Sequence, residues 1–217
     1  MATFCSNKLL LNELLQAICS SDAVHARWLN TLSYLENTGA RKIAQAEHPT
    51  LVQEEMLKHA AEEFRHAHHL KRQIEKITQE KIENYSVEYM LGGMHTLHYL
   101  HALDIQTCRF LKQAGKRCNR EIASLAYLLV TYAIELRADE LYKVYDDVLR
   151  EGTSKVSVKS ILLEEKEHLR EMQEALEKIA GGLSYAEQIC HIEGRLCTQW
   201  LQAVYRGVQI GETAIKI

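Results

Sequence analysis

Pro49 is the only proline in this chain of 217 residues, and that scarcity limits what the chain can fold into. Proline breaks helix interiors, so long proline-free stretches rich in strong helix formers favour helices. The β-branched residues never run in the strict alternation that predicts a half-buried strand. We therefore expect an all-α protein, with a break between two helices at His48-Pro49.

Apolar spacing and turn residues divide the chain into helices. The expected helices cover 6–19, 22–47, 50–80, 119–150, 157–180 and 184–208. Asp22 and Asn119 are the expected N-terminal caps of their helices, and Ser184 with Glu187 matches a capping box. The less regular stretch 81–118 contains Gly92-Gly93 and Gly115, which predicts a partly helical crossover connection between two helical hairpins. We expect a single domain over 1–217, with a four-helix core at about 22–180 and added helices before and after it.

Charge and cysteine content narrow the function classes. With 26 Lys and Arg against 29 Asp and Glu, interleaved along the chain, the net charge is -3, which predicts no basic face for nucleic acid. The six cysteines form no C-x-x-C pair, which favours reduced thiols and a cytoplasmic location. No signal peptide or membrane-spanning run is recognisable, so no membrane association is expected.

The pattern Glu-x-x-His occurs once in each predicted hairpin, as Glu63-Phe-Arg-His66 and Glu165-Lys-Glu-His168. A spacing of three places the carboxylate and the imidazole on one helix face, where both can bind the same metal ion. One pair lies in the second core helix and the other in the fourth. The two hairpins therefore look like repeats of one metal-binding unit.

Each partner helix supplies one further carboxylate. Glu36 and Glu135 interrupt the largely apolar stripes of their helices and lie at a depth similar to Glu63 and Glu165. Four buried carboxylates repel one another strongly unless they are protonated or bound to cations. Two divalent metal ions balance the four charges, so we expect a metal site formed by Glu36, Glu63, His66, Glu135, Glu165 and His168.

These six residues, in this order, resemble the ligand set of the ferritin-like diiron-carboxylate superfamily. The resemblance covers about 22–180 and implies a ferritin-like four-helix bundle with two iron ions, O2 as co-substrate and oxidation or hydroxylation of an organic substrate. Manganese suits the same ligands. By the same resemblance, Glu62 and Glu164 accept the remaining imidazole N–H groups. Glu167 departs from the family pattern, because it stands where Arg65 stands in the first Glu-x-x-His segment.

The resemblance leaves several functions open. The segment Ile134-Glu-Leu-Arg-Ala-Asp-Glu140 is similar to the third helix of the tRNA hydroxylase branch, so the substrate is a small molecule or a modified nucleoside. For such an oxygenase we also expect an electron-donor protein as a partner and a monomeric or homodimeric state. Iron storage by a ferroxidase is the alternative, as is a helical interaction protein without metal. A rubrerythrin-like peroxidase is disfavoured because paired C-x-x-C motifs are missing from the sequence.

Further histidines and one glycine lie near the predicted ligands or in the crossover stretch. His95, His98 and His101 repeat every three residues, but this spacing drifts around a helix and favours polar surface residues over a second metal site. His59, His68 and His69 are expected to face solvent. Gly39 lies mid-helix near Glu36, where it leaves room beside the metal ions or permits close approach of helices.

Overall fold

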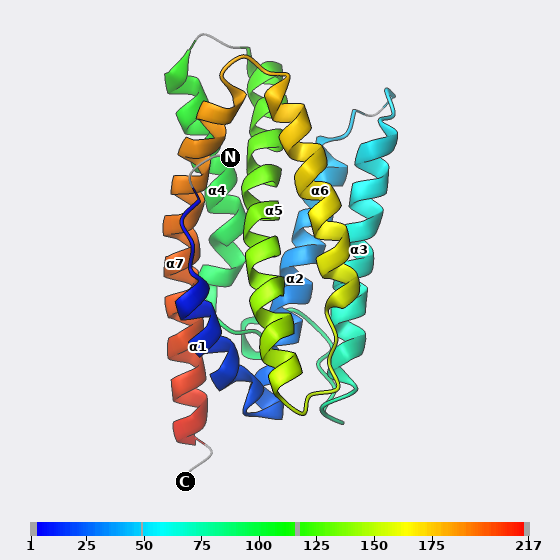
Figure 1. Ribbon diagram of the computed structural model, residues 1–217, viewed down its shortest axis with the longest axis vertical. Coiled ribbons are helices and arrows are strands. Elements are labelled where there is room, and N and C mark those ends of the chain that lie inside the picture. The colour runs from blue at the N-terminus through cyan, green and yellow to red at the C-terminus, as the bar shows by residue number, and fades with distance from the viewer. Residues whose placement is uncertain (1–3, 49, 116–117, 215–217) are drawn as a thin grey trace.

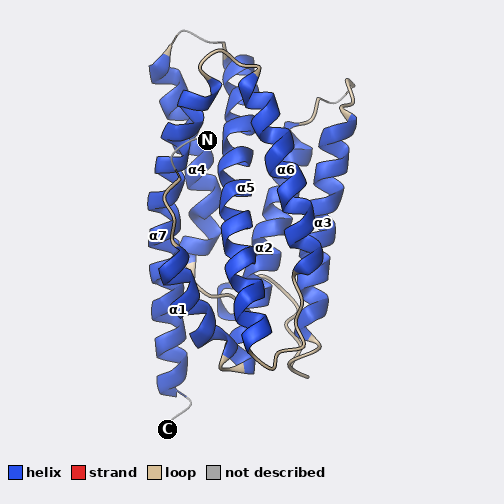
Figure 2. Ribbon diagram, viewed as in Figure 1, coloured by secondary structure: helices blue, strands red, loops and turns tan. Residues whose placement is uncertain are grey.

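A computed structural model describes residues 4–48, 50–115 and 118–214 of the chain. The expectation of an all-α protein is confirmed: the described residues form seven α-helices and one short 3-10 turn, without a strand (Figures 1 and 2). The elements are α1 (Lys8–Cys19), α2 (Asp22–Ala46), α3 (Glu54–Ile74), η1 (Val87–Tyr89), α4 (Met94–Ala114), α5 (Asn119–Glu151), α6 (Lys159–Glu177) and α7 (Gly182–Ala214).

Two helical hairpins form the part of the bundle that carries the predicted ligands. Helix α2 packs along α3, and α5 packs along α6. Helix α4 lies beside α5 and α7, at the edge of the bundle opposite α3 (Figure 1), and α1 packs across α5 and α2. No helix within the described ranges combines the length and hydrophobicity needed to cross a bilayer.

The crossover segment differs most from the sequence-based expectation. Stretch 81–118 was predicted to be a less regular connection, but it contains α4, a full helix of 21 residues. Gly92 and Gly93 precede it with φ values of +79° and +53°, a conformation that the Cβ atom of any other residue disfavours. The two glycines therefore set the turn into a helix that covers one side of the bundle.

Several helix ends also differ from the prediction. Helix α3 is shorter than 50–80, and α7 begins at Gly182 and ends at Ala214, so Ser184 lies inside α7 and the capping box predicted there is wrong. A capping box occurs instead at α5, where Glu121 accepts a hydrogen bond from the backbone N–H of Cys118. Helix α2 ends at Ala46, and Pro49 lies outside the described residues.

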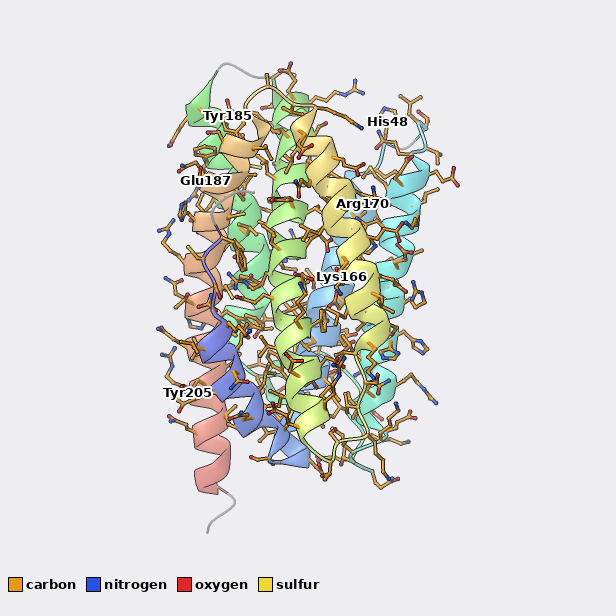
Figure 3. All side chains as sticks on the ribbon, in the orientation of Figure 1. His48, Lys166, Arg170, Tyr185, Glu187 and Tyr205 are labelled. Carbon is orange, nitrogen blue, oxygen red and sulfur yellow. The ribbon has the colours of Figure 1, made fainter. Side chains whose placement is uncertain are left out.

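Large apolar and aromatic side chains fill the space between the helices (Figure 3). Trp200 of α7 stacks on Trp28 of α2 and on Tyr99 of α4, with ring centroids 5.8 and 5.3 Å apart. The labelled side chains Lys166 and Arg170 of α6 and Tyr205 of α7 lie on the outside of the bundle (Figure 3). The stacked aromatic rings in the interior therefore join α2, α4 and α7.

Candidate metal site

The six predicted ligands come together between the two hairpins. Glu36 projects from α2, Glu63 and His66 from α3, Glu135 from α5, and Glu165 and His168 from α6. Glu36 is partly buried, and each of the other five is at most 6% exposed. The similar depth predicted for the carboxylates from their sequence spacing is therefore found, although binding of a metal by these residues stays a prediction.

Ligand atoms from these six residues and from His59 form two overlapping groups. The first, here called the histidine-rich group, consists of His59, Glu63, Glu135 and His168; the second, the carboxylate-rich group, consists of Glu36, Glu63, His66 and Glu165. Within each group one potential ligand atom per residue lies within 4.8 Å of all the others. Glu63 belongs to both groups, so its carboxylate is placed where it can join two adjacent metal ions.

The prediction that His59 faces solvent is wrong. This side chain is 3% exposed, its Nε2 atom lies 3.0 Å from Glu135 Oε1 and 3.3 Å from Glu63 Oε1, and its ring centroid is 4.1 Å from that of His168. One turn of helix separates His59 from Glu63, so an i, i+4 search along the ligand stripe would have found it. The same prediction holds for His68, which is exposed.

His69 was also expected to face solvent, but its side chain is partly buried. Its Nε2 atom lies 2.8 Å from the backbone oxygen of Ser157 and 3.1 Å from Gln73 Nε2. His69 therefore ties α3 to the connection before α6. His95, His98 and His101 are all exposed on α4, and they form no metal-binding group among the described residues.

Four buried atoms in the cluster lack a hydrogen-bond partner. They are His66 Nδ1, His168 Nδ1, Glu135 Oε2 and Glu165 Oε1. Buried polar atoms without a partner cost free energy, so native proteins rarely keep several in one place. Two imidazole nitrogens and two carboxylate oxygens are donors of the type that divalent metals bind. The cluster therefore fits a metal centre.

The far nitrogens of both imidazoles are held by carboxylates of the opposite helix. His66 Nε2 lies 2.7 Å from Glu164 on α6, and His168 Nε2 lies 2.8 Å from Glu62 on α3. These are the two partners named from the sequence, and the contacts are crossed between the helices. Because a carboxylate accepts the Nε2–H, each Nδ1 is left to face the cluster as a lone-pair donor.

Glu167, which replaces the arginine of the family pattern, takes part in an ion pair between α3 and α6, as Arg65 does. Arg65 donates two hydrogen bonds to Glu164, of 2.9 and 2.7 Å, which link α3 to α6. At the other end of the α3–α6 pair, Glu167 faces Lys58, with Lys58 Nζ 3.4 Å away and also 3.3 Å from Glu171. The charges are therefore exchanged between the helices, and both ends of the pair still carry an ion pair.

Burial and mutual repulsion change the acidity of the carboxyl groups. Burial raises the pKa of Glu36 well above its usual range, and the nearby charge of Glu63 raises it further. Burial likewise raises the pKa of Glu135, and the charge of Glu165 adds to this effect. Burial also opposes ionisation of Glu165, but its interactions with Glu135, His168 and His66 outweigh this effect and lower its pKa. Without metal, Glu165 is therefore more acidic than Glu36 and Glu135.

Burial acts on the imidazoles in the opposite direction and lowers their pKa values. For His168, the nearby carboxylate of Glu165 and the hydrogen bond to Glu62 outweigh burial and raise the pKa to about 9. For His66, the nearby carboxylates of Glu165 and Glu63 outweigh burial and raise the pKa overall. The metal-free cluster is thus partly neutralised by protons, which a bound cation would displace.

Tyr142 is a second residue of the site that sequence reasoning missed. Its hydroxyl donates a hydrogen bond to Glu36 Oε1. Tyr142 is 1% exposed, and burial raises the pKa of its phenol well above the usual range, so it stays a neutral donor. It lies two turns beyond Glu135, on the same stripe of α5, and this spacing was the available signal.

The fold and the site define this chain as a helical bundle with a buried Glu/His cluster that can hold metal. Comparison with protein-family models, with curated proteins and with solved structures found no match in any of the three. The resemblance to the ferritin-like superfamily therefore stays a prediction, carried by the ligand residues and their arrangement.

Proposed function

We propose that this protein is a non-haem diiron oxidoreductase of ferritin-like type that uses O2 to oxidise or hydroxylate an organic substrate. The observation that carries the proposal is the pair of ligand groups sharing Glu63, each supplied by residues of both hairpins. One ion would be held by the histidine-rich group and the other by the carboxylate-rich group.

Charge and donor chemistry support two divalent ions of iron type. The four carboxylates Glu36, Glu63, Glu135 and Glu165 match the four positive charges of two such ions. The two groups contain carboxylate oxygens and imidazole nitrogens and no thiolate, a donor set that suits iron or manganese better than softer ions. When bound, iron would supply the redox chemistry with O2.

The chain's own residues have three tasks in this proposal. Glu62 and Glu164 hold the two imidazoles in the orientation that leaves Nδ1 free for the metal. Tyr142 fixes one oxygen of Glu36. The buried surroundings exclude bulk water, which strengthens every electrostatic interaction within the cluster.

Iron storage by a ferroxidase uses the same ligand types, so the cluster alone does not separate the two functions. A cavity of about 370 Å³ that reaches Glu36, Glu63, Glu135 and Glu165 favours the oxidoreductase, because storage needs no room for an organic molecule. This size falls within the range of about 300–1,000 Å³ that is usual for small-molecule sites.

The test follows iron and oxygen together. Protein loaded anaerobically with ferrous iron is exposed to O2, and oxygen uptake, iron retained per chain and particle mass are measured. The oxidoreductase proposal predicts oxygen uptake with about two irons retained per chain, by a monomer or dimer. Uptake with continued accumulation of ferric iron in a 24-subunit shell would assign the protein to storage, and no uptake would contradict both functions.

A further inference from the structure

The cavity beside the metal cluster lies between α2, α4 and α5. Its inner end is formed by carboxylates of the cluster, among them Glu36 and Glu135, and it extends from there toward the partly exposed residues Lys42 and Asp104. It therefore connects the proposed metal centre with the surface of the bundle at the α2–α4 side, away from the α3–α6 pair.

Apolar side chains make most of the wall. Helix α2 contributes Leu32, Leu35 and Ile43, α4 contributes Leu100, and α5 contributes Ala126, Val130, Ile134, Ala138 and Leu141. Such a wall offers a ligand hydrophobic burial and little hydrogen bonding. The ligand that gains most from it is predominantly apolar.

The cationic groups of the wall are already paired with anions. Lys42 forms an ion pair with Asp104 across the α2–α4 side. Arg137 donates hydrogen bonds of 2.9 and 2.8 Å to Glu193 and also contacts Glu140. Among the lining residues that the structure describes, no cation is therefore left to balance a negatively charged ligand, and burial of an unpaired charge costs free energy.

Gly39 helps to keep the cavity open. A Cβ atom placed on Gly39 would meet a single neighbour, Glu63 Oε2, at 3.9 Å, so open space lies around this position. Glycine inside a helix destabilises it relative to alanine, and close packing does not require it here. Of the two explanations weighed for Gly39 from the sequence, room beside the cluster is the one that the structure supports.

We propose that this cavity is a binding site for a neutral, predominantly apolar small molecule, which lies with one end at the carboxylates of the cluster. The proposal rests on the proposed function for the meaning of that placement, because the bound molecule would be the substrate of the metal centre. Binding itself needs only the cavity and can be measured without iron.

Intrinsic fluorescence gives a direct readout, since the chain has only two tryptophans and Trp200 lines the cavity. In a Trp28→Phe background, primary alcohols of six to ten carbons are titrated into metal-free and zinc-loaded protein, beside carboxylates of equal length. Alcohols should bind saturably, about fourfold tighter for each added methylene, the factor that corresponds to burial of about 0.8 kcal/mol per CH2. Carboxylates should bind at least tenfold more weakly.

Variants locate the binding. Ala126 lies nine residues before Glu135 along α5, so Ala126→Leu fills the cavity away from the cluster. Gly39→Leu fills the cavity beside the cluster. Each should weaken alcohol binding about tenfold or more, whereas Ala61→Leu on the exposed face of α3 should leave it unchanged. The proposal is overturned if alcohols do not saturate, if carboxylates bind as tightly, or if both cavity variants bind like wild type.

Metal content, measured on the same samples, separates this proposal from the proposed function. If the protein binds two metal ions per chain but no alcohol saturably, the proposed apolar ligand is contradicted and the proposed metal centre is not. If the wild-type protein binds alcohols but takes up no metal, the cavity site is supported and the diiron function is contradicted.

Discussion

The two ligand groups come from hairpins that look alike in sequence, yet they differ in composition. The histidine-rich group has two imidazoles and two carboxylates, whereas the carboxylate-rich group has one imidazole and three carboxylates. The extra imidazole of the histidine-rich group comes from one position, His59. His59 lies four residues before Glu63, and the corresponding place before Glu165 is Ile161, a fully buried apolar residue. The repeat that made the site visible therefore predicts symmetry, and His59 breaks it.

The asymmetry teaches that the two metal positions should not be equivalent. An ion in the histidine-rich group would be held by two neutral donors and two anions, and an ion in the other group by one neutral donor and three anions. The carboxylate-rich group also carries a phenol, through the hydrogen bond from Tyr142 to Glu36. The cavity reaches carboxylates of both groups, so a substrate would meet both positions.

The largest effect is expected where the two groups overlap. Glu63→Ala removes a ligand from both, so the capacity for ferrous iron should fall from about two ions per chain to less than one. Glu36→Ala removes a ligand from the carboxylate-rich group alone and should leave about one tight ion. Anaerobic titration of both variants makes the comparison, and equal capacities would show that Glu63 is not shared.

His59 should matter to one position only. His59→Ala is expected to weaken one of the two binding steps on the order of 100-fold, the upper part of the range for residues that orient or complete a metal site. Cobalt titration, followed by the visible spectrum, resolves the two steps. His68→Ala, on the exposed face of the same helix, is the control. Weakening of both steps alike would contradict the assignment of His59 to one group.

The crossed hydrogen bonds predict a smaller and selective effect. Glu62→Gln loosens His168, a member of the histidine-rich group, and Glu164→Gln loosens His66, a member of the other. Each should weaken its own binding step about tenfold. If both variants weaken the same step in the cobalt titration, the division into two groups is wrong.

The fold was more predictable than the contents of the site. Helix formers and a single proline predict the all-α class directly, and the Glu-x-x-His spacing predicts which faces of α3 and α6 turn inward. The full length of helix α4 was not predicted, because Gly92-Gly93 and Gly115 indicate an irregular connection, whereas they lie at or beyond the two ends of the helix. Local glycine signals cannot tell the boundary of a helix from its interruption.

His59 and Tyr142 were missed for a different reason. A histidine or tyrosine on a helix stripe is compatible with surface, core and ligand roles, and only the neighbouring helices decide among them. The carboxylate of Glu135, on α5, is what gives His59 of α3 its partner. The cavity likewise depends on how three helices are spaced, and a sequence without structure carries little information about that spacing.

The smallest effect concerns stability without metal. Raised pKa values of Glu36, Glu135, His66 and His168 mean that the folded metal-free protein binds more protons than the unfolded chain. Stability from these groups is complete below their unfolded values and is lost as pH rises through the folded ones. We expect the melting temperature of metal-free protein to fall between pH 7 and pH 9, where His168 titrates at about 9.

Neutral variants test the origin of this loss. Glu36→Gln and Glu135→Gln should each raise the metal-free melting temperature at pH 8 by roughly 2–4 °C, equivalent to about 1 kcal/mol, because an amide removes the repulsion. The same variants should lose part of the stabilisation by metal, which for wild type is roughly 2.7 kcal/mol at a hundredfold excess over the dissociation constant. Unchanged melting temperatures in all four samples would place the carboxylates outside a coupled cluster.

The central claim is that one buried cluster holds two ions. Metal-depleted wild-type protein, titrated anaerobically with ferrous iron and followed by bound metal and by melting temperature, tests it most directly. The account predicts a break at about two ions per chain, with a rise in melting temperature that is complete at the same point. A break at one ion, or no binding with an unchanged melting temperature, would contradict it.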